Sequence, residues 1–301
     1  MRFPLVLLLA TALAASGCAE RDDDDVRDDD GALLGGVVAP GGTYRSVVRV
    51  DDNCTGTLVG PRLILTASHC LRTPLGQVSP SFAVGRDLTV EVRTAAGALE
   101  MVRVPIARAE IHPRLTEVCA AENGGKGCSG PSAAAKRDAP DLAVIEIGRA
   151  LPHAVVMPIS QRGAAVGESV APAGFGCFDR IAGRSDDSLR IGSTFVIDPA
   201  EVAHPGSGIT APVAQQLSSV YLYTEGPALY GHNVASLCQG DSGGPLFRES
   251  SKGPELLGVA SSYTFQAGVT EAAATSWFSR TDKDAKNDVL AWLRRNGATI
   301  R

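Results

Sequence analysis

The 301-residue sequence has few aromatic residues (5%), no excess of positive charge and, beyond its first residues, no long apolar run. A membrane-spanning helix needs about 18 apolar residues, so a multi-pass membrane protein is excluded. The formal net charge of −5 argues against nucleic acid as a partner, because phosphate binding requires a basic surface. No repeat of fixed period is present, which excludes a solenoid. The 44% of hydrophobic residues is typical of a globular protein with a core.

The acidity of the chain is confined to its N-terminal segment. Residues 1–30 contain eight acidic and three basic residues, so the remainder of the chain has equal numbers of each. A basic start followed by the apolar stretch Leu5–Ala15 has the layout of a signal peptide, and we therefore expect an exported protein. Aspartates at 22–25 and 28–30 repel one another and cannot be buried, so residues 18–32 are predicted to form an acidic, disordered tether or propeptide.

Two cleavage sites are compatible with this leader. Ala12–Ala14 offers a plain signal-peptidase site, whereas Ala15–Cys18 is similar to a bacterial lipobox, in which the cysteine becomes the lipidated first residue. The chain has seven cysteines, so lipidation of Cys18 leaves six that can pair, whereas the plain cut leaves an odd thiol in an oxidising compartment. We therefore predict a lipoprotein signal peptide at residues 1–17 and attachment to a bacterial outer membrane or cell surface through Cys18. Plain secretion is the alternative.

The body of the chain has the pattern of an all-β protein with one helix at its end. Short β-branched and apolar runs separated by Gly and Pro predict a sandwich or a pair of barrels. Examples of these runs are Tyr44–Val50, Arg62–Thr66, Thr89–Arg93, Met101–Pro105, Leu142–Ile147, Ser193–Ile197, Val220–Tyr223 and Leu256–Ser261. Near the end, Thr281 or Asp282 can cap a helix, apolar residues recur at helical spacing from Ala285 to Leu293, and Gly297 suits a stop. We expect a C-terminal helix at about residues 282–296.

Three residues supply the side-chain types of a nucleophilic triad. A serine hydroxyl is a poor nucleophile unless a base takes its proton and a third group orients that base. His69, Asp141 and Ser242 are those types, within the sequences T-A-S-H-C, D-L-A-V and G-D-S-G-G-P. Residues 240–244 also match G-x-S-x-G, the nucleophile elbow of α/β-hydrolases. That fold needs its His after the Ser, and all five histidines precede Ser242, so the order excludes it.

With these motifs in this order, the chain resembles the trypsin/chymotrypsin-like serine peptidases over roughly residues 33–296. In that family T-A-A-H-C, D-I-A-L and G-D-S-G-G-P carry the triad. The resemblance implies a peptidase domain at 33–301 built from two six-stranded antiparallel β-barrels, at about 33–150 and 160–280. The active site is expected in the cleft between them.

The resemblance also implies roles for the site residues. Ser242 attacks the carbonyl, His69 takes and returns the proton, and Asp141 orients the imidazole. The N–H groups of Gly240 and Ser242 form the oxyanion hole. The implied activity is a monomeric serine endopeptidase that acts on protein or peptide substrates and needs no metal or organic cofactor. A non-catalytic or partner-activated binding module on the same fold is the alternative.

The resemblance assigns the cysteines to disulfides. Cys54 and Cys70 match the family disulfide beside the catalytic histidine, and Cys119–Cys128 closes a Gly-rich loop before the triad aspartate. In the family, the cysteine just before the Gly-Asp-Ser motif has its partner downstream. No cysteine follows that motif here, so Cys177 is left to pair with Cys238. No C-x-x-C motif or spaced Cys/His pair indicates a metal site.

Asp241 is predicted to take part in activation. In the family this carboxylate is buried against the α-amino group released by zymogen cleavage, usually at I-V-G-G. Residues 33–36 read L-L-G-G here, so the resemblance implies cleavage after Ala32 and an ion pair from Leu33 to Asp241. A buried carboxylate needs such a cation. The other interpretation of residues 33–36 is an ordinary strand lead-in that needs no cleavage.

The specificity pocket departs from that of trypsins. Ser236 stands at its base, where trypsins have Asp, so a preference for Lys or Arg is not expected. Ser261 and Tyr263 align with the pocket wall and the substrate-binding strand. Tyr263 either narrows the pocket toward small side chains or packs on the neighbouring loop. If the carboxylate of Glu271 reached the pocket, it would restore a preference for substrates with Lys or Arg.

Overall fold

The computed structural model describes residues 33–122, 127–128, 138–177, 185–231, 234–269 and 272–301. The leader and tether predicted for residues 1–32, including Cys18, lie outside these ranges, as does Glu271. None of the described helices is long and apolar enough to cross a membrane.

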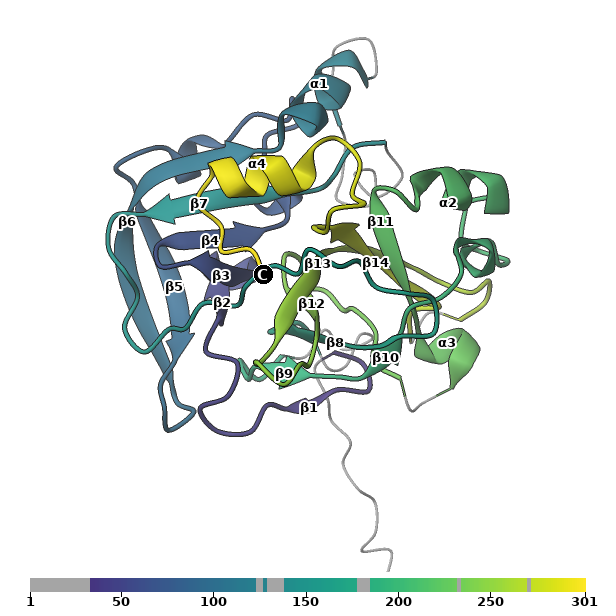
Figure 1. Cartoon of the computed structure of the whole chain (residues 1–301), viewed down its shortest axis with the longest axis horizontal. Helices are drawn as coiled ribbons and strands as arrows, with labels where there is room; N and C mark the ends of the chain where they lie inside the picture. The colour runs from purple at the N-terminus through teal and green to yellow at the C-terminus, as the bar shows by residue number, and fades with distance from the viewer. Residues whose placement is uncertain (1–32, 123–126, 129–137, 178–184, 232–233, 270–271) are drawn as a thin grey trace, which may run out of the picture.

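The first half of the fold is a closed antiparallel barrel of six strands in the order β2-β3-β4-β7-β6-β5 (Figure 1). Its strands are β2 (Val47–Val50), β3 (Cys54–Gly60), β4 (Leu63–Thr66), β5 (Asp87–Arg93), β6 (Leu99–Ile111) and β7 (Ala143–Ile147). On β5 and β6, buried apolar residues alternate with more exposed ones, and the register pairs Leu88 with Val104 and Val90 with Val102. This period-2 alternation places one face of each strand in the barrel interior.

The helices are short and lie outside the sheets. The α-helices are α1 (Pro113–Ala121), α2 (Ala211–Leu217), α3 (Pro227–Tyr230) and α4 (Val289–Arg295). The 3-10 helices are η1 (Asp51–Asn53), η2 (Ser68–Cys70), η3 (Pro80–Phe82) and η6 (Pro199–Val202).

The second half is an open antiparallel sheet, in the order β1-β9-β8-β12-β13-β14-β11 with β10 also paired to β8. Its strands are β1 (Val37–Val38), β8 (Ser169–Gly174), β9 (Arg190–Ile191), β10 (Thr194–Phe195), β11 (Tyr221–Glu225), β12 (Pro245–Arg248), β13 (Glu255–Thr264) and β14 (Thr275–Arg280). The described part of the chain therefore begins on this sheet, with β1 on its edge, before it enters the barrel (Figure 1).

The prediction of two closed barrels was correct for the first and wrong for the second. Beyond β10, one bridge between Val196 and Thr224 and one hydrogen bond from Ile197 N–H to the Tyr223 carbonyl (3.0 Å) reach β11. Asp198 then caps η6 with its side chain, and the chain turns away before a ladder can form. The sheet consequently stays open at this point.

The C-terminal helix is shorter than predicted. It begins after Asp288, a residue with φ of 56°, so the prediction of helix before Val289 was wrong. The reason is that the carboxylate of Asp282 is fully buried and accepts hydrogen bonds from the Arg280 guanidinium (3.0 and 3.1 Å) and from Asp284 N–H (2.8 Å). These bonds hold the segment as a turn. The apolar stripe of α4 is buried, as predicted.

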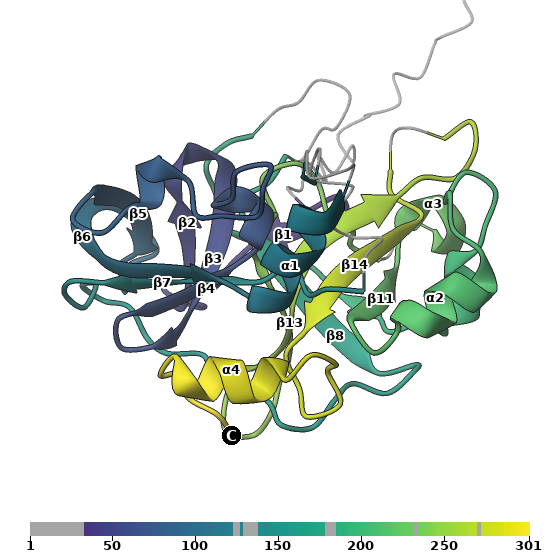
Figure 2. The ribbon, with the colours of Figure 1, turned by 90° about the horizontal axis from the view of Figure 1, so that it is seen from above.

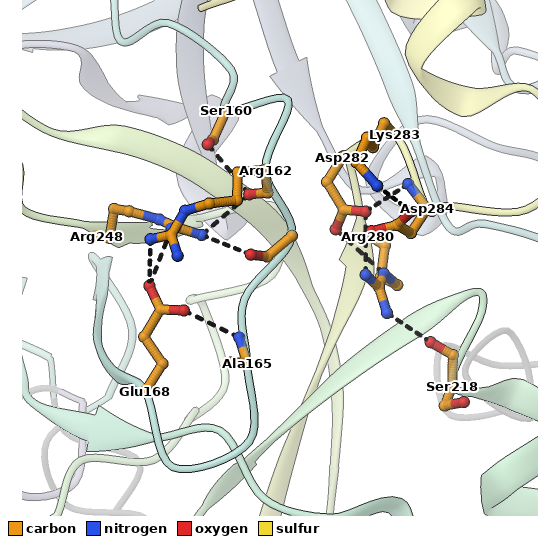
Figure 3. A network of polar contacts seen from close by, with 11 residues as sticks. Ser160, Arg162, Ala165, Glu168, Ser218, Arg248, Arg280, Asp282, Lys283 and Asp284 are labelled. Carbon is orange, nitrogen blue, oxygen red and sulfur yellow. Dashed lines mark hydrogen bonds and ion pairs between the residues drawn. The ribbon is translucent and has the colours of Figure 1, made fainter.

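Two arginines of the second sheet hold loops beside it, and only Arg248 holds the connection that crosses from the barrel (Figure 3). Arg248 on β12 donates to the carbonyls of Arg162 and Gly163, both at 3.0 Å, and pairs with Glu168 at 3.1 Å. Arg280 at the end of β14 pairs with the buried Asp282. Buried charges of this kind are tolerated because each has a partner of opposite sign.

The barrel and the sheet share an apolar core, which fixes their relative position. The shared cluster includes Leu65, Val144, Phe247, Val259 and Trp292, from β4, β7, β12, β13 and α4. Figure 2 shows α4 lying along one side of this junction. Any site formed between the two halves is thus held by a continuous core.

Candidate active site

His69 and Asp141 form a short, buried contact at the edge of the barrel. His69 lies in η2, directly after β4, and Asp141 lies just before β7, the strand that pairs with β4. The His69 Nδ1 atom is 2.6 Å from Asp141 Oδ2, and the His69 N–H donates to Oδ1 at 3.0 Å. The carboxylate therefore fixes both the ring and the backbone of the histidine.

The carboxylate of Asp141 has no exposed surface and is surrounded by donors. The Ser68 hydroxyl donates to one carboxylate oxygen and the Ser261 hydroxyl to the other, the latter at 2.7 Å. Its backbone N–H donates to Ser279 Oγ at 3.0 Å. Burial acts to raise the pKa of Asp141, but the charge of His69 and the three side-chain hydrogen bonds outweigh it and hold the pKa below its ordinary value.

The turn that carries Ser242 comes from the second sheet and is fastened to the barrel. Thr55 on β3 donates its N–H to the Ser242 carbonyl at 2.8 Å and its hydroxyl to the Gly240 carbonyl at 2.9 Å. Cys70, the neighbour of His69, has its Sγ 3.8 Å from the same Ser242 carbonyl. The backbone of Ser242 therefore lies beside the 3-10 helix of His69.

Two backbone N–H groups of this turn have no acceptor within the part of the chain that the structure describes. Asp241, Gly243 and Gly244 donate to backbone carbonyls, whereas Gly240 and Ser242 meet no acceptor among the described residues. Gly240 has a φ of 102°, and a Cβ there would lie 2.8 Å from the Cα of Gly176. Only glycine fits this conformation and this close approach.

Asp241 is a fully buried carboxylate. It accepts hydrogen bonds from Cys238 N–H (2.8 Å) and Gly176 N–H (2.9 Å), and no basic side chain in the described part of the chain pairs with it. Burial raises its pKa to about 7, against the lowering effect of these two hydrogen bonds. Leu33 is fully buried, and its neighbour Leu34 forms a β-bridge with Ser236, which precedes Asp241 in the chain.

The structure contains the three disulfides expected: Cys54–Cys70, Cys119–Cys128 and Cys177–Cys238. The first joins the start of β3 to the end of η2, so it links Thr55 and His69. The third joins the two segments that donate to Asp241. Among the described residues there is no group of three side chains able to hold a metal ion.

The residues predicted for the specificity pocket lie in different surroundings. Ser236 is buried, and its hydroxyl has no hydrogen-bond partner among the described residues. Tyr263 packs edge-to-face on Phe265, with ring centroids 5.3 Å apart. Ser261 donates to Asp141, a contact that the sequence did not predict for it.

Sequence reasoning missed three further residues of the site. Ser68, Ser279 and Thr55 hold the aspartate and the serine turn. A signal was present only for Ser68, which stands where the family motif T-A-A-H-C has its second alanine. Ser279 and Thr55 reach the site through strand pairing between distant segments, which the local sequence does not encode.

The similarity to known proteins agrees with this geometry. The family model described as Trypsin matches residues 34–276, which is more than half of the chain. The match includes the segments of His69, Asp141 and Ser242. The chain therefore belongs to the trypsin family.

Proposed function

We propose that this protein is a serine endopeptidase in which Ser242 is the nucleophile. The observation that carries the proposal is the 2.6 Å contact between His69 and the buried Asp141, beside the turn of Ser242. A carboxylate held in this way fixes the imidazole tautomer, so that the other ring nitrogen is free to accept a proton. Family membership supports the same activity.

The reaction proceeds through an acyl-enzyme. The Ser242 hydroxyl attacks the peptide carbonyl while His69 takes its proton, and His69 then delivers that proton to the departing amine. Water, activated by the same imidazole, releases the acyl group. The N–H groups of Gly240 and Ser242, which have no acceptor among the described residues, donate to the oxyanion.

Activation requires cleavage before Leu33 in this proposal. The support is the buried Asp241, whose raised pKa reflects the cost of a carboxylate with no cation beside it in the described chain. The new α-amino group of Leu33 would supply that cation and stabilise the turn of Gly240 and Ser242. Cleavage after Ala32 is not tryptic, so the activating enzyme has a different specificity.

The specificity and location are proposed from the sequence features described above. A neutral Ser236, with a buried hydroxyl that lacks a partner among the described residues, offers no counter-charge for Lys or Arg, which supports a non-tryptic preference. The lipobox-like segment at Ala15–Cys18 supports export and attachment of the uncleaved precursor to a bacterial membrane through lipid on Cys18, and cleavage before Leu33 would release the peptidase domain from this anchor. Mass spectrometry of the N-terminal peptide distinguishes this attachment from plain secretion.

Labelling with a fluorophosphonate tests the proposed activity, because this reagent reacts with activated serines. The exported protein should be labelled once processing has exposed Leu33, and Ser242→Ala should abolish the labelling. Ser81→Ala, at an exposed serine, is the matched control and should label like the wild type. A folded, processed protein that resists labelling contradicts the proposal and favours the binding module.

A further inference from the structure

The segments that carry His69 and Asp141 are joined by a disulfide-bonded element on the barrel surface. We call this element the α1 clamp: helix α1 together with Gly127 and Cys128, which the Cys119–Cys128 disulfide ties to the helix. In Figure 1, α1 lies at the top of the molecule, beyond the barrel strands and the second sheet. Along the chain it follows β6 and precedes the segment of Asp141.

The clamp holds the loop that follows His69. Arg72, three residues after His69, donates from Nη1 to the Cys128 carbonyl at 3.1 Å. Cys128 N–H donates to the Pro74 carbonyl at 2.8 Å, and the Thr116 hydroxyl donates to the Gly76 carbonyl at 2.8 Å. The same loop is continuous with η2, because Arg72 N–H donates to the Ser68 carbonyl at 2.9 Å.

The contact between clamp and loop is closely packed. A Cβ on Gly127 would lie 2.2 Å from the Pro74 carbonyl oxygen, and one on Gly76 would lie 3.0 Å from the Cβ of Cys119. Both glycines have positive φ, at 89° and 73°. Backbones that approach this closely transmit a displacement of one to the other, because protein interiors have few voids.

The clamp also holds the segment of Asp141 from both sides. His112, the N-cap of α1, donates its N–H to the Leu142 carbonyl at 3.0 Å. Arg114 Nε donates to the Asp138 carbonyl at 3.4 Å. Leu115 and Cys119 of the helix are fully buried in the barrel core, so the helix itself is fixed.

We infer that the α1 clamp is a positioning element for the His69–Asp141 pair. The inference rests on the proposed function, since it assigns the clamp a part in the serine peptidase reaction. The disulfide keeps Cys128 against Pro74 and Arg72, and through them keeps η2 at the distance from Asp141 at which the carboxylate orients the His69 imidazole. Misplacement of a catalytic group by about 1 Å costs roughly a hundredfold in rate.

Kinetics of a small ester substrate test the inference. The double variant Cys119→Ala/Cys128→Ala should lower kcat about ten- to a hundredfold and leave KM nearly unchanged, because a small ester does not contact the clamp. Arg72→Ala, which keeps the disulfide, should lower kcat in the same direction, and Arg72→Lys should restore part of it. Leu88→Ala is the control for a loss of core packing as such, because Leu88 lies on β5, which makes none of the hydrogen bonds between the clamp and the two segments.

Proton NMR provides a readout that does not depend on activity. The Nδ1 proton of His69 in its short bond to Asp141 should give a low-field resonance, which Asp141→Asn removes and thereby assigns. Exchange should broaden this resonance in the clamp variants and leave it sharp in Leu88→Ala. An unchanged resonance and an unchanged kcat in folded clamp variants would overturn the inference, as would an equal loss of kcat in Leu88→Ala. A wild type that shows the resonance but no hydrolysis would instead contradict the proposed function.

Discussion

The barrel and the open sheet differ in what fills them. The barrel interior consists of aliphatic side chains from all six strands, among them Val50, Leu58, Val90 and Ile145. The sheet buries polar residues along its strands. These include Thr194, Thr224, Arg248, Thr264, Thr275, Ser276 and Ser279, whereas the barrel strands bury fewer polar residues, Thr55, Thr57, Thr66 and Arg93. The barrel is thus stabilised mainly by apolar burial, whereas the sheet also depends on hydrogen bonds between buried side chains, such as that between Thr264 and Thr275.

The two halves exchange polar contacts at the site. The Ser261 hydroxyl donates a hydrogen bond to the Asp141 carboxylate, and the Ser279 hydroxyl oxygen accepts one from the Asp141 N–H. Both serines belong to the sheet, whereas Asp141 lies beside the barrel. Thr55 of the barrel holds the turn of Ser242, which belongs to the sheet. Each half therefore positions a residue that the other half carries, and the comparison can be tested by breaking contacts of each kind.

The largest effect is expected from Asp141→Asn at the barrel edge. The amide can hold the imidazole only in the wrong tautomer, so kcat should fall about 10⁴-fold while the fold is retained. Ser279→Ala, which removes only the acceptor for the Asp141 N–H, should cost far less. Steady-state kinetics measure the fall in kcat, and circular dichroism checks that the fold is retained. A fall in kcat of less than tenfold would contradict a role for Asp141 in the mechanism.

The pH dependence of Asp141 has a definite sign. Its pKa is lowered in the folded state, so its ionised form stabilises the fold above the unfolded pKa of about 4. This contribution is lost as pH falls through the folded value. In Asp141→Asn, the acid branch of the stability curve should therefore be flatter than in the wild type.

The next effect is expected in the sheet, from Asp282→Ala. Asp282 is fully buried and paired with Arg280, whose side chain is mostly buried as well. Removing the carboxylate leaves an uncompensated cation, so the free energy of unfolding should fall by about 3–5 kcal/mol. Urea denaturation measures it. A fall under about 1 kcal/mol would mean that water already solvates Arg280.

Asp241→Asn is expected to have opposite effects before and after cleavage. In the uncleaved chain the folded pKa of about 7 exceeds the unfolded value, so the folded state keeps a proton that the unfolded state loses between about pH 4 and 7. Stability therefore falls by about 1.4 kcal/mol per pH unit across that window. The Asn variant lacks this slope and should be the more stable protein at pH 8.

After cleavage before Leu33, the order of stability at pH 8 should be reversed, with Asp241→Asn less stable than the wild type. The new ammonium group would pair with Asp241, and Asn at this position cannot form that pair. The cleaved variant should therefore lose activity, while the uncleaved one gains stability at pH 8. Urea midpoints at pH 5 and 8 on both forms provide the measurement. If the stability of the wild type and of Asp241→Asn changes equally between pH 5 and 8, Asp241 is ionised in both the folded and the unfolded state.

The sequence predicted the barrel better than the sheet for a physical reason. Period-2 runs such as Thr89–Arg93 mark strands with one apolar face, and β5 extends only slightly beyond this run. Strands of the sheet lack this pattern, because residues such as Thr275 and Ser276 are polar and buried. The strands β8, β12 and β14 were not among the runs named from the sequence, nor was β3 of the barrel, and the failure of the second barrel to close was not predicted.

The residues of the site also divide into those that the local sequence marks and those that it does not. His69, Asp141 and Ser242 stand in short, recognisable motifs, so local sequence was sufficient to single them out. Their supporting hydroxyls come from Thr55 and Ser279, whose roles depend on tertiary placement. Asp282 was predicted as a possible helix cap. Its buried pairing with Arg280 was missed, because that pairing depends on a turn that the sequence pattern does not mark.

The smallest effect is expected from a charge pair on the barrel surface. Arg62 and Glu146 are 3.2 Å apart, with 51% and 31% of their side chains exposed, and Glu146 also contacts Arg108. Solvent screens such pairs, so Arg62→Ala should change the free energy of unfolding by less than about 1 kcal/mol. The Arg62→Ala/Glu146→Gln cycle isolates the coupling. A coupling as large as the loss in Asp282→Ala would contradict the contrast between a barrel held by apolar burial and a sheet held by buried polar pairs.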